Sequence, residues 1–291
     1  MNYTINIKGK LLFTDAPLVM GILNATPDSF YEASRKAGAD ELLATARRML
    51  AAGAAILDVG GCSTRPTGEP VSEEEELRRL HAALDVLDSS LPADTVVSVD
   101  TYRARVAREC VQNHNVSIIN DVSGFDWDRD MFDTVVALNV PYILTHSVGW
   151  AGDAAEYTSF LPDVLASLSR KVWQLRQAGV KDIIIDPGFG FGKSVQQNYE
   201  LLAALPMFRQ IEAPLLVGMS RKSMITNVLG NSPQDALAGT VALNMAALER
   251  GADILRVHDV EEAVETVALY SALKKADESL FGKKIDNTYI Y

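Results

Sequence analysis

The sequence predicts an α/β fold, a (β/α)8 TIM barrel in a single domain with a short N-terminal β-hairpin. The first observation behind this prediction is a series of eight short apolar runs, separated by helical patterns and spaced roughly 25–45 residues apart. The second is that every run ends in polar residues, as the strands of barrel enzymes do. An open, doubly wound sheet is the alternative, but that fold does not require polar residues after every strand.

The hairpin is predicted from residues 3–13, where apolar and polar residues alternate loosely around Lys8 and Gly9. Residues 1–17 then form a hairpin extension, and residues 18–278 form the barrel. Residues 279–291 are polar, and we expect them to be a loosely held C-terminal tail.

The eight expected strands are short and rich in Val, Ile and Leu, which is typical of strands that are buried on both faces. They lie at residues 18–23, 54–59, 95–99, 116–119, 141–144, 183–186, 214–219 and 253–259.

Helix signals separate these strands. Residues 39–52 are rich in Ala and Leu, and Ser72 with Glu75 forms a capping box at a helix start. Ser232 and Pro233 are expected to begin another helix as its N-cap and first residue. A last amphipathic helix should run over about residues 260–278.

The composition excludes several classes of function. A net charge of −11 argues against non-specific binding to nucleic acids or membrane surfaces, since both need a basic patch. No apolar run approaches the roughly 20 residues of a membrane span, and the N-terminus lacks the basic-then-apolar order of a signal peptide. Cys62 and Cys110 make no disulfide framework, so a cytoplasmic location is expected.

Polar residues at the strand ends suggest the kind of ligand. Acids and amides that face a few cations suit a flat polar heterocycle with donors and acceptors along its edge. These residues are Asn24, Asp58, Asp100, Asn120, His146, Asp186, Lys222, Arg256 and His258. Arg65 and Arg221, together with Lys222, Arg256 and His258, could also hold an anion such as a diphosphate.

Two familiar site types are not supported by the motifs. The run at residues 188–194 mimics a phosphate-binding loop, but Pro187 stands where such a loop needs its first glycine. The same run fails the dinucleotide pattern because Lys193 stands at the last glycine position. No His-x-x-x-His or Cys-x-x-Cys spacing occurs, so a zinc site is not expected.

Seven blocks of sequence, almost one for each strand, resemble the dihydropteroate synthase family of pterin-binding enzymes. They are MGILNATPDSF (20–30), ILDVGGCSTRP (56–66), VSVDT (97–101), INDVSG (119–124), DPGFGFGK (186–193), VGMSRKS (217–223) and RVHDV (256–260). The resemblance implies that the chain condenses 6-hydroxymethyl-7,8-dihydropterin diphosphate with 4-aminobenzoate, giving 7,8-dihydropteroate and diphosphate in folate biosynthesis.

The resemblance also implies the residues that bind the pterin. Asp186 matches the carboxylate that accepts hydrogen bonds from the 2-amino group and the ring N–H, a pairing suited to two parallel donors. Lys222 matches the lysine at the ring carbonyl, and Arg256 matches the guanidinium that stacks on the ring. The other residues implied along the pterin are Asp100, Asn120 and Phe191.

Asn24, Arg256 and His258 match the pocket for the diphosphate, where Mg²⁺ bridges the phosphate oxygens and Asn24 supplies a carbonyl ligand. Lys222, Arg256 and His258 then act as the catalytic residues by stabilising the leaving group, with no enzyme nucleophile or general base. The residues implied on the 4-aminobenzoate side are Phe30, Thr64, Arg65, Pro66 and Ser220. The family also implies a homodimer, for which helix 235–250 is a candidate.

Several positions depart from the family pattern. Cys62 stands where the family has Glu, Thr67 precedes Gly68, Ser147 replaces a methionine, and residues 31–34 lack two glycines. These changes keep open a non-catalytic or altered-specificity pterin-binding paralogue. A pterin-binding methyltransferase of the methyltetrahydrofolate type is a further alternative, but it has no diphosphate for Arg256 and His258 to hold.

Overall fold

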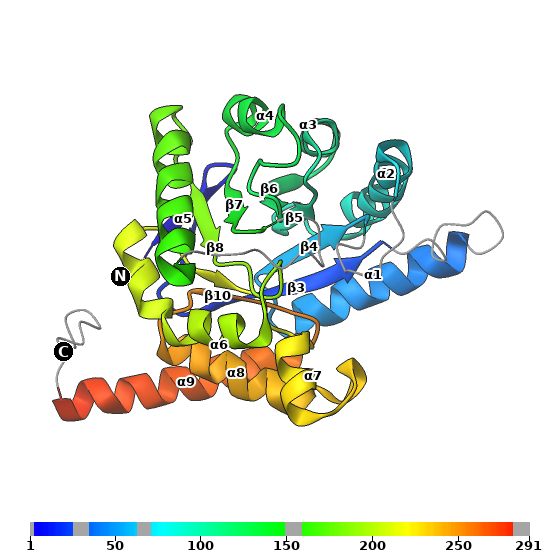
Figure 1. The fold of residues 1–291 in the computed structure, drawn as a ribbon. Helices are drawn as coiled ribbons and strands as arrows, with labels where there is room; N and C mark the ends of the chain where they lie inside the picture. Colours follow the sequence, from blue (N-terminus) through cyan, green and yellow to red (C-terminus); the bar gives the residue numbers. More distant parts are fainter. Residues whose placement is uncertain (1–2, 26–34, 63–70, 149–158, 282–291) are drawn as a thin grey trace.

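A computed structural model of the chain describes residues 3–25, 35–62, 71–148 and 159–281. In these ranges one eight-stranded parallel sheet curls into a barrel, and helices pack around its outside (Figure 1). The strand order is β8-β7-β6-β5-β4-β3-β10-β9, and a parallel bridge between Ile185 and Leu215 connects the two ends of the sheet. The predicted (β/α)8 barrel with an N-terminal hairpin is therefore confirmed.

The barrel strands occupy the predicted positions, but most are shorter or shifted by one or two residues. They are β3 (Leu18–Asn24), β4 (Ile56–Gly60), β5 (Val97–Asp100), β6 (Val116–Asp121), β7 (Tyr142–Thr145), β8 (Ile183–Asp186), β9 (Leu216–Val217) and β10 (Ile254–Val257). The prediction of a strand over 214–219 was too long. Only Leu216 and Val217 pair with β10, and the chain then turns at Arg221, whose φ is 58°.

The helices alternate with the strands along the chain. They are α1 (Arg35–Ala51), α2 (Glu73–Ser90), α3 (Ala104–Asn113), α4 (Met131–Leu138), α5 (Phe160–Gln177), α6 (Val195–Ala203), α7 (Ser223–Leu229), α8 (Leu237–Glu249) and α9 (Val260–Phe281). None of the helices within the described ranges is both long and apolar enough to cross a membrane.

Two predicted boundaries differ from the structure. Ser232 and Pro233 begin a short 3-10 helix, η3 (Pro233–Asp235), rather than the long helix itself. The Ser232 hydroxyl donates to the Asp235 carboxylate at 2.6 Å, and α8 starts two residues later at Leu237. At the other boundary, α9 continues to Phe281, so residues 279–281 belong to the helix and not to the expected tail. Residues 282–291 lie outside the described ranges.

The N-terminal hairpin closes the amino-terminal end of the barrel. Strands β1 (Thr4–Ile7) and β2 (Lys10–Phe13) pair antiparallel around the Lys8–Gly9 turn. Ile5 and Ile7 are buried against the aliphatic side chains inside the barrel. Those side chains are Met20, Ile56, Ile118, Ile143, Ile184, Leu216 and Ile254. The interior of the barrel at this end is therefore an apolar core.

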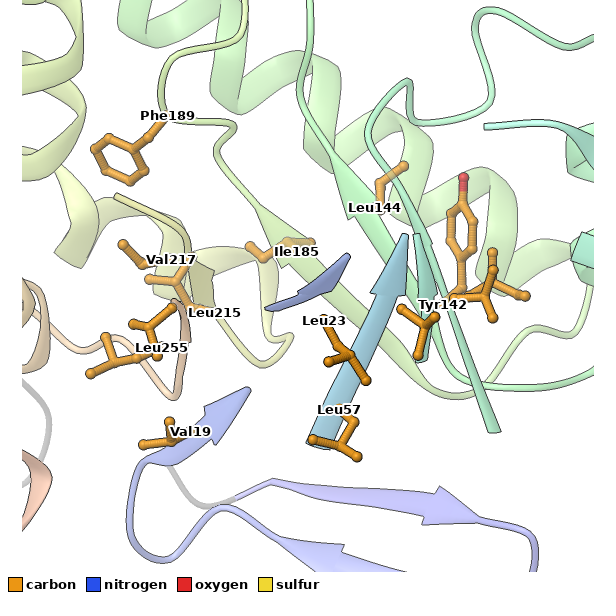
Figure 2. Packing of buried hydrophobic residues seen from close by; sticks show 14 of the residues in the cluster. Val19, Leu23, Leu57, Tyr142, Leu144, Ile185, Phe189, Leu215, Val217 and Leu255 are labelled. Carbon is orange, nitrogen blue, oxygen red and sulfur yellow. The ribbon is translucent and has the colours of Figure 1, made fainter. Parts of the chain in front are cut away.

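A second, larger core lies between the outward face of the strands and the helices. Figure 2 shows 14 of its members and labels ten of them, among them Val19, Leu57 and Leu255. Because side chains alternate along a strand, each strand contributes one set of residues to this outer layer and the other set to the barrel interior. This alternation decides which polar residues can reach the site.

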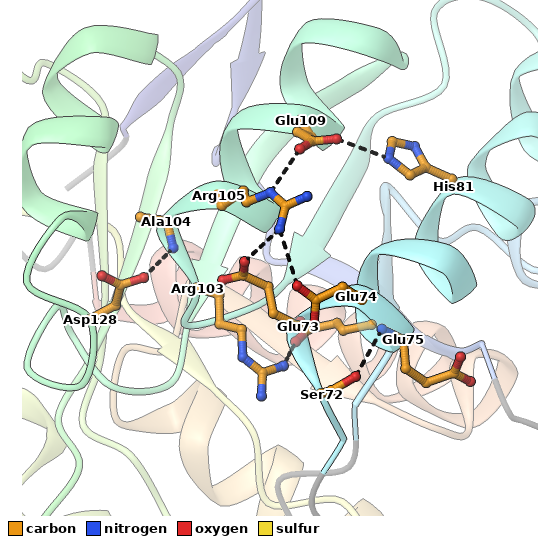
Figure 3. A network of polar contacts seen from close by, with 11 residues as sticks. Ser72, Glu73, Glu74, Glu75, His81, Arg103, Ala104, Arg105, Glu109 and Asp128 are labelled. Carbon is orange, nitrogen blue, oxygen red and sulfur yellow. Dashed lines mark hydrogen bonds and ion pairs between the residues drawn. The ribbon is translucent and has the colours of Figure 1, made fainter.

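Helices α2 and α3 are joined by a polar network at the surface (Figure 3). Ser72 caps α2 as predicted, because its hydroxyl accepts the Glu75 backbone N–H at 3.2 Å. The Glu75 carboxylate, however, pairs with Arg78 and Arg79, so only half of the predicted capping box forms in the described part of the chain. A complete capping box occurs at α6, where Ser194 and Gln197 bond reciprocally, and the sequence analysis did not identify it.

Candidate active site at the carboxyl end of the barrel

Four strands each carry an isoleucine toward the barrel interior and a polar residue two positions later. The pairs are Ile56 and Asp58, Ile118 and Asn120, Ile184 and Asp186, and Ile254 and Arg256. A step of two keeps a side chain on the same face of a strand. The interior therefore changes from aliphatic at the amino-terminal end to charged and polar at the carboxyl end.

Arg256 lies at the centre of these charged and polar side chains, which we call the polar layer. Its Nε–H donates to Asp58 Oδ2 at 2.6 Å, and its Nη2 donates to Asp100 Oδ2 at 2.6 Å. Asn120 Nδ2 donates to the same oxygen of Asp58 at 2.9 Å. One guanidinium thus joins groups from β4, β5, β6 and β10, which are far apart in the sequence.

Burial strongly affects the charges in this layer. Burial raises the pKa of Asp100 from 3.8 to about 7, against the opposing effect of Arg256. The pKa of Arg256 is raised above its usual value because the neighbouring Asp58 and Asp100 outweigh the effect of burial. When both carboxylates are ionised, they outnumber the single guanidinium, and this negative excess favours a ligand that presents N–H donors.

Asp186 ends β8 and is also buried, which raises its pKa, while Lys222 has the largest opposing effect. Its Oδ1 accepts the Gly188 backbone N–H at 2.7 Å. Gly188 has a φ of 76°, and a Cβ there would lie 1.9 Å from the backbone oxygen of His146. Only glycine fits this turn, so the position of the carboxylate depends on it.

Lys193 stabilises the same turn. Its Nζ donates to the backbone oxygens of His146, Gly188 and Phe191 at 2.8 to 3.0 Å. The hydrogen-bond partners of this ammonium group are therefore carbonyl groups. Burial lowers the pKa of Lys193 to about 7, although Asp186 opposes the shift. The lysine therefore holds the loop after β8 against the end of β7.

Lys222 extends over this loop. Its Nζ donates to the backbone oxygen of Phe189 and lies 4.4 Å from the centre of the Phe191 ring. Burial lowers the pKa of Lys222 to about 8, with Asp186 acting in the opposite direction. Gly190 leaves room for its passage, because a Cβ at that position would lie 3.1 Å from Lys222 Cδ.

The predicted anion-binding residues lie on neighbouring strands. The Ser220 hydroxyl and His258 Nδ1 are 3.0 Å apart. Asn24 is exposed at the end of β3, and its Cα pairs with Gly60, which in turn pairs with Asp100. The structure thus places Asn24 at the same rim of the barrel as Asp100, the partner of Arg256.

Other predicted candidates have different roles. Arg221 makes a bidentate ion pair with Asp259 at 2.9 and 2.6 Å. His146 is buried at the end of β7, where burial and the nearby Lys193 and Lys171 lower its pKa to about 3. It is therefore neutral at physiological pH. Burial and Glu76 raise the pKa of the Cys62 thiol, which argues against a thiolate.

Phe30, Thr64, Arg65 and Pro66, the predicted contacts for 4-aminobenzoate, lie outside the described residues, as do Thr67 and residues 31–34. Only Ser220 of that set has a described position. In the described part of the chain, no group of three or more His, Cys, Asp or Glu side chains could hold a metal ion.

The sequence analysis listed Asp58 among the polar residues at the strand ends but assigned it no role in binding the pterin. Its side chain is fully buried and contacts both Arg256 and Asn120. The available signal was its spacing, because Asp58 follows Ile56 by two residues just as Asn120 follows Ile118. Asp58 and Asn120 therefore lie on the interior face of their strands, and this spacing predicts that both side chains reach the same site.

A separate surface crevice of about 280 Å³ lies far from this chemistry, near the amino-terminal end of β5. It is lined by Leu87, Asp88, Leu91, Pro92, Ala93, Thr95, Val97 and Asn115. The polar layer, and not this crevice, is the candidate active site, because the buried charges with shifted pKa values lie there.

Comparisons with known proteins identify the family of the chain. The family model described as "Pterin binding enzyme" matches residues 20–258. The dihydropteroate synthase of Haemophilus influenzae is 39% identical over 272 residues, which cover 92% of this chain and 98% of that protein. The Escherichia coli dihydropteroate synthase is 37% identical over 277 residues, covering 94% and 97%.

Solved structures give the same result. Yersinia pestis dihydropteroate synthase, solved with a sulfonamide drug, has a TM-score of 0.85 at 37% identity and covers 94% of this chain and 100% of that chain. The Xanthomonas albilineans enzyme with 4-aminobenzoic acid has a TM-score of 0.84 at 36% identity and covers 94% and 98%. The chain therefore belongs to the pterin-binding enzyme family, and within it to the dihydropteroate synthases.

Proposed function

We propose that the polar layer binds 6-hydroxymethyl-7,8-dihydropterin diphosphate and joins it to 4-aminobenzoate, the reaction of EC 2.5.1.15. The C–O bond between the pterin methylene and the diphosphate breaks. The arylamine nitrogen forms the new C–N bond and loses one proton, giving 7,8-dihydropteroate. The observation that carries this proposal is the convergence of Asp58, Asp100 and Asn120 on Arg256 at one end of the barrel.

The pterin edge is assigned to the acceptors of this layer. Asp186 has one backbone donor at Oδ1 and can accept the 2-amino group and the adjacent ring N–H. Asp100 and Asn120 line the rest of the edge, and Lys222 reaches the ring carbonyl. Phe191 lies under the Lys222 ammonium and forms part of the wall. A buried site with these groups already in place spends little free energy on ordering when the ligand binds.

The leaving diphosphate is assigned to Arg256, His258 and Asn24. A guanidinium has five N–H groups, and the contacts to Asp58 and Asp100 account for two of them. The others can face the phosphate oxygens. Ser220 holds the His258 ring at Nδ1. The catalytic contribution of Lys222, Arg256 and His258 is electrostatic, because negative charge grows on the diphosphate as the C–O bond breaks.

Mg²⁺ fits this site as a cation that arrives with the diphosphate. The Asn24 side chain is exposed at the rim and offers one carbonyl oxygen. No group of three acidic, His or Cys side chains surrounds it in the described ranges. Mg²⁺ commonly accepts one or two protein ligands together with substrate phosphates and water. When bound, Mg²⁺ would neutralise part of the charge on the departing diphosphate.

For 4-aminobenzoate, we assign Phe30, Thr64, Arg65, Pro66 and Ser220. Ser220 supports this assignment because it lies three residues after the end of β9 and contacts His258. The amine would then approach the methylene from the side of β9 and β10, next to the diphosphate pocket. The carboxylate of the substrate would need a cation, and Arg65 is the candidate.

A homodimer in the cytoplasm is part of the same proposal. Helices α7, α8 and α9 lie together on one side of the barrel in Figure 1. Val228 and Leu229 on α7 and Leu269 and Leu273 on α9 are large exposed apolar residues. We assign this face to the dimer and expect Leu269→Glu to give a monomer in light scattering, whereas a change at Leu11 in the hairpin should not.

The deciding experiment incubates the protein with the dihydropterin diphosphate, 4-aminobenzoate and Mg²⁺ and measures released diphosphate. Release with formation of 7,8-dihydropteroate supports the proposal. Pterin binding without release would instead select the non-catalytic paralogue.

A matched pair of variants tests the pterin assignment. Asp186→Asn replaces an acceptor with a donor and should weaken pterin binding about 100-fold. Asp182→Asn, at the other end of the same strand, serves as the control and should leave affinity unchanged. Equal affinity in both variants would remove Asp186 from the site.

A further inference from the structure

Asp58 uses only one of its two carboxylate oxygens for the contacts described above. Oδ2 accepts both Arg256 Nε–H at 2.6 Å and Asn120 Nδ2–H at 2.9 Å. Oδ1 is buried and has no hydrogen-bond partner in the described part of the chain. A buried acceptor without a partner carries a desolvation cost, so such atoms are rare and usually bind water or a ligand.

The contact with Asp58 decides the orientation of Asn120. A carboxylate only accepts hydrogen bonds, so the amide must direct its NH2 group toward Asp58. The carbonyl oxygen of Asn120 is then the group that remains for a ligand. Asn120 therefore presents an acceptor, and it can recognise an N–H on the heterocycle but not a carbonyl.

The same contact also fixes Arg256. Asp58 holds the Nε side of the guanidinium, and Asp100 holds Nη2. Two anchors in different strands define the plane of the group, because the guanidinium itself is flat and rigid. The plane of Arg256 determines whether it can stack on a flat ring and direct its other N–H groups to an anion.

A second buried atom is in the same condition as Asp58 Oδ1. The hydroxyl of Ser98 is fully buried and also has no hydrogen-bond partner within the described ranges. Ser98 and Asp58 are direct Cα partners on the neighbouring strands β5 and β4. Ser98 lies two residues before Asp100, so both face the barrel interior. A water molecule that donates to Asp58 Oδ1 and accepts from Ser98 would satisfy both atoms.

We propose that Asp58 is a positioning residue of the pterin site. It orients Asn120 so that the amide carbonyl oxygen is presented to the ligand, and it fixes the plane of the Arg256 guanidinium. Asp58 is itself held by Ser98 through a buried water. This inference rests on the proposed function. Asp58 acts through Asn120 and Arg256 and does not touch the reacting atoms.

The first test measures binding of the dihydropterin diphosphate by calorimetry without 4-aminobenzoate, for the wild type and for Asp58→Asn. The variant should bind about 30-fold more weakly, since it lacks the charged acceptor that orients two binding residues. Asp253→Asn is the matched control. Asp253 is a buried carboxylate paired with Arg209 at 2.8 and 3.0 Å at the opposite end of the barrel. This control should keep the wild-type affinity.

The second test does not depend on whether Asp58→Asn folds. Asn120→Asp keeps an acceptor for the pterin but places a carboxylate against Asp58. The inference predicts a loss of about 30-fold in pterin affinity, because the two carboxylates repel and rotate apart. If Asn120 simply supplied an acceptor, the aspartate would bind the pterin equally well or better, and that result would overturn the inference.

The role of Ser98 is tested with Ser98→Ala and a high-resolution crystal structure. We expect a water within hydrogen-bond distance of Asp58 Oδ1 and Ser98 Oγ, and about 3-fold weaker pterin binding in the variant. The absence of a water between Asp58 and Ser98, together with unchanged pterin affinity in Ser98→Ala, would contradict the role of Ser98. If the wild type itself does not bind the dihydropterin diphosphate, the proposed function fails. If it binds and Asp58→Asn binds equally well, only this inference fails.

Discussion

The two ends of the barrel each contain a partly buried arginine paired with a buried aspartate, but the two pairs are built differently. At the amino-terminal end, both oxygens of Asp253 accept from Arg209, and one also accepts the Leu215 backbone N–H at 2.8 Å. At the carboxyl end, Arg256 is divided between Asp58 and Asp100, and Asp58 Oδ1 has no partner among the described residues.

This difference separates stability from function in the same fold. The amino-terminal end has satisfied polar groups and an apolar plug formed by the hairpin, so it can contribute stability. The carboxyl end keeps buried charges and an acceptor, Asp58 Oδ1, that has no hydrogen-bond partner among the described residues. This arrangement stabilises the free protein poorly but leaves charged and polar groups available to a ligand. Binding sites commonly keep such unfavourable features because the ligand completes them.

The largest effect should come from Arg256→Ala. Loss of this guanidinium removes the cation at the leaving group, so kcat should fall about 1,000-fold. Arg209→Ala removes the arginine of the other end and is the control. It should lower the melting temperature but leave kcat of the folded enzyme near the wild-type value. Steady-state kinetics measures kcat for both variants. An equal loss of kcat in the two would contradict the assignment of function to the carboxyl end alone.

The next largest effect should be on stability, at the hairpin residues Ile5 and Ile7 that pack inside the amino-terminal end of the barrel. Ile5 is 1% exposed inside the barrel end, and Ile5→Ala leaves a cavity that should cost about 3 kcal/mol in the free energy of unfolding. Leu11→Ala, on the exposed face of the same hairpin, should cost less than about 0.5 kcal/mol. Urea titration measures both values. A loss of kcat in folded Ile5→Ala would show that the two ends are not independent.

The pH dependence of kcat/KM should show a narrow maximum between about 7 and 8. Asp100 must be ionised to hold Arg256, and its pKa is raised to about 7. Lys222 must be protonated at the ring carbonyl, and its pKa is lowered to about 8. Activity should therefore change about tenfold per pH unit outside this window. Lys222→Arg should move the alkaline limb upward, and an unchanged limb would argue against Lys222.

The same groups affect stability with a defined sign. The native pKa of Asp100, about 7, lies above its ordinary value of 3.8, so its contribution to stability falls as pH rises from 3.8 to about 7. The native pKa of Lys222, about 8, lies below 10.5, so its contribution rises from about 8 to 10.5.

The smallest effect should be at the turn of the hairpin. Lys8 and Gly9 both have positive φ angles, 48° and 88°, in a two-residue hairpin turn that favours Asn-Gly. Lys8→Asn should stabilise the protein by about 0.5 kcal/mol, although it loses the exposed hydrogen bond to Asn115. Thermal unfolding measures the change, and the activity should not respond. Destabilisation would mean that the Lys8–Asn115 contact outweighs the backbone preference.

Most of the fold could be predicted from the sequence, because apolar runs, glycine turns and polar strand ends are local patterns. The hairpin, all eight strand positions and the family blocks were predicted in this way. The short β9 could not be predicted, because its length depends on pairing with β10 and on the turn at Arg221. The 3-10 start at Pro233 depends on Ser232 and Asp235 bonding to each other.

For the site, residue types and their strand-end positions indicated Asp100, Asn120, Lys222 and Arg256, while their partners required the tertiary structure. Lys193 illustrates this limit. A lysine next to a carboxylate suggests an ion pair, but the fold brings three carbonyl groups to it instead.

The sequence by itself determined the order of strands and helices, the identity of the polar residues at each strand end and the family. Those features could be determined because they depend on local periodicity and on motifs within single segments of the chain. Only the tertiary structure decided that Asp58 lies between Asn120 and Arg256, although 62 and 198 residues separate it from them. Curling of the sheet brings distant strand ends together, and hydrogen-bond polarity then follows from which groups meet.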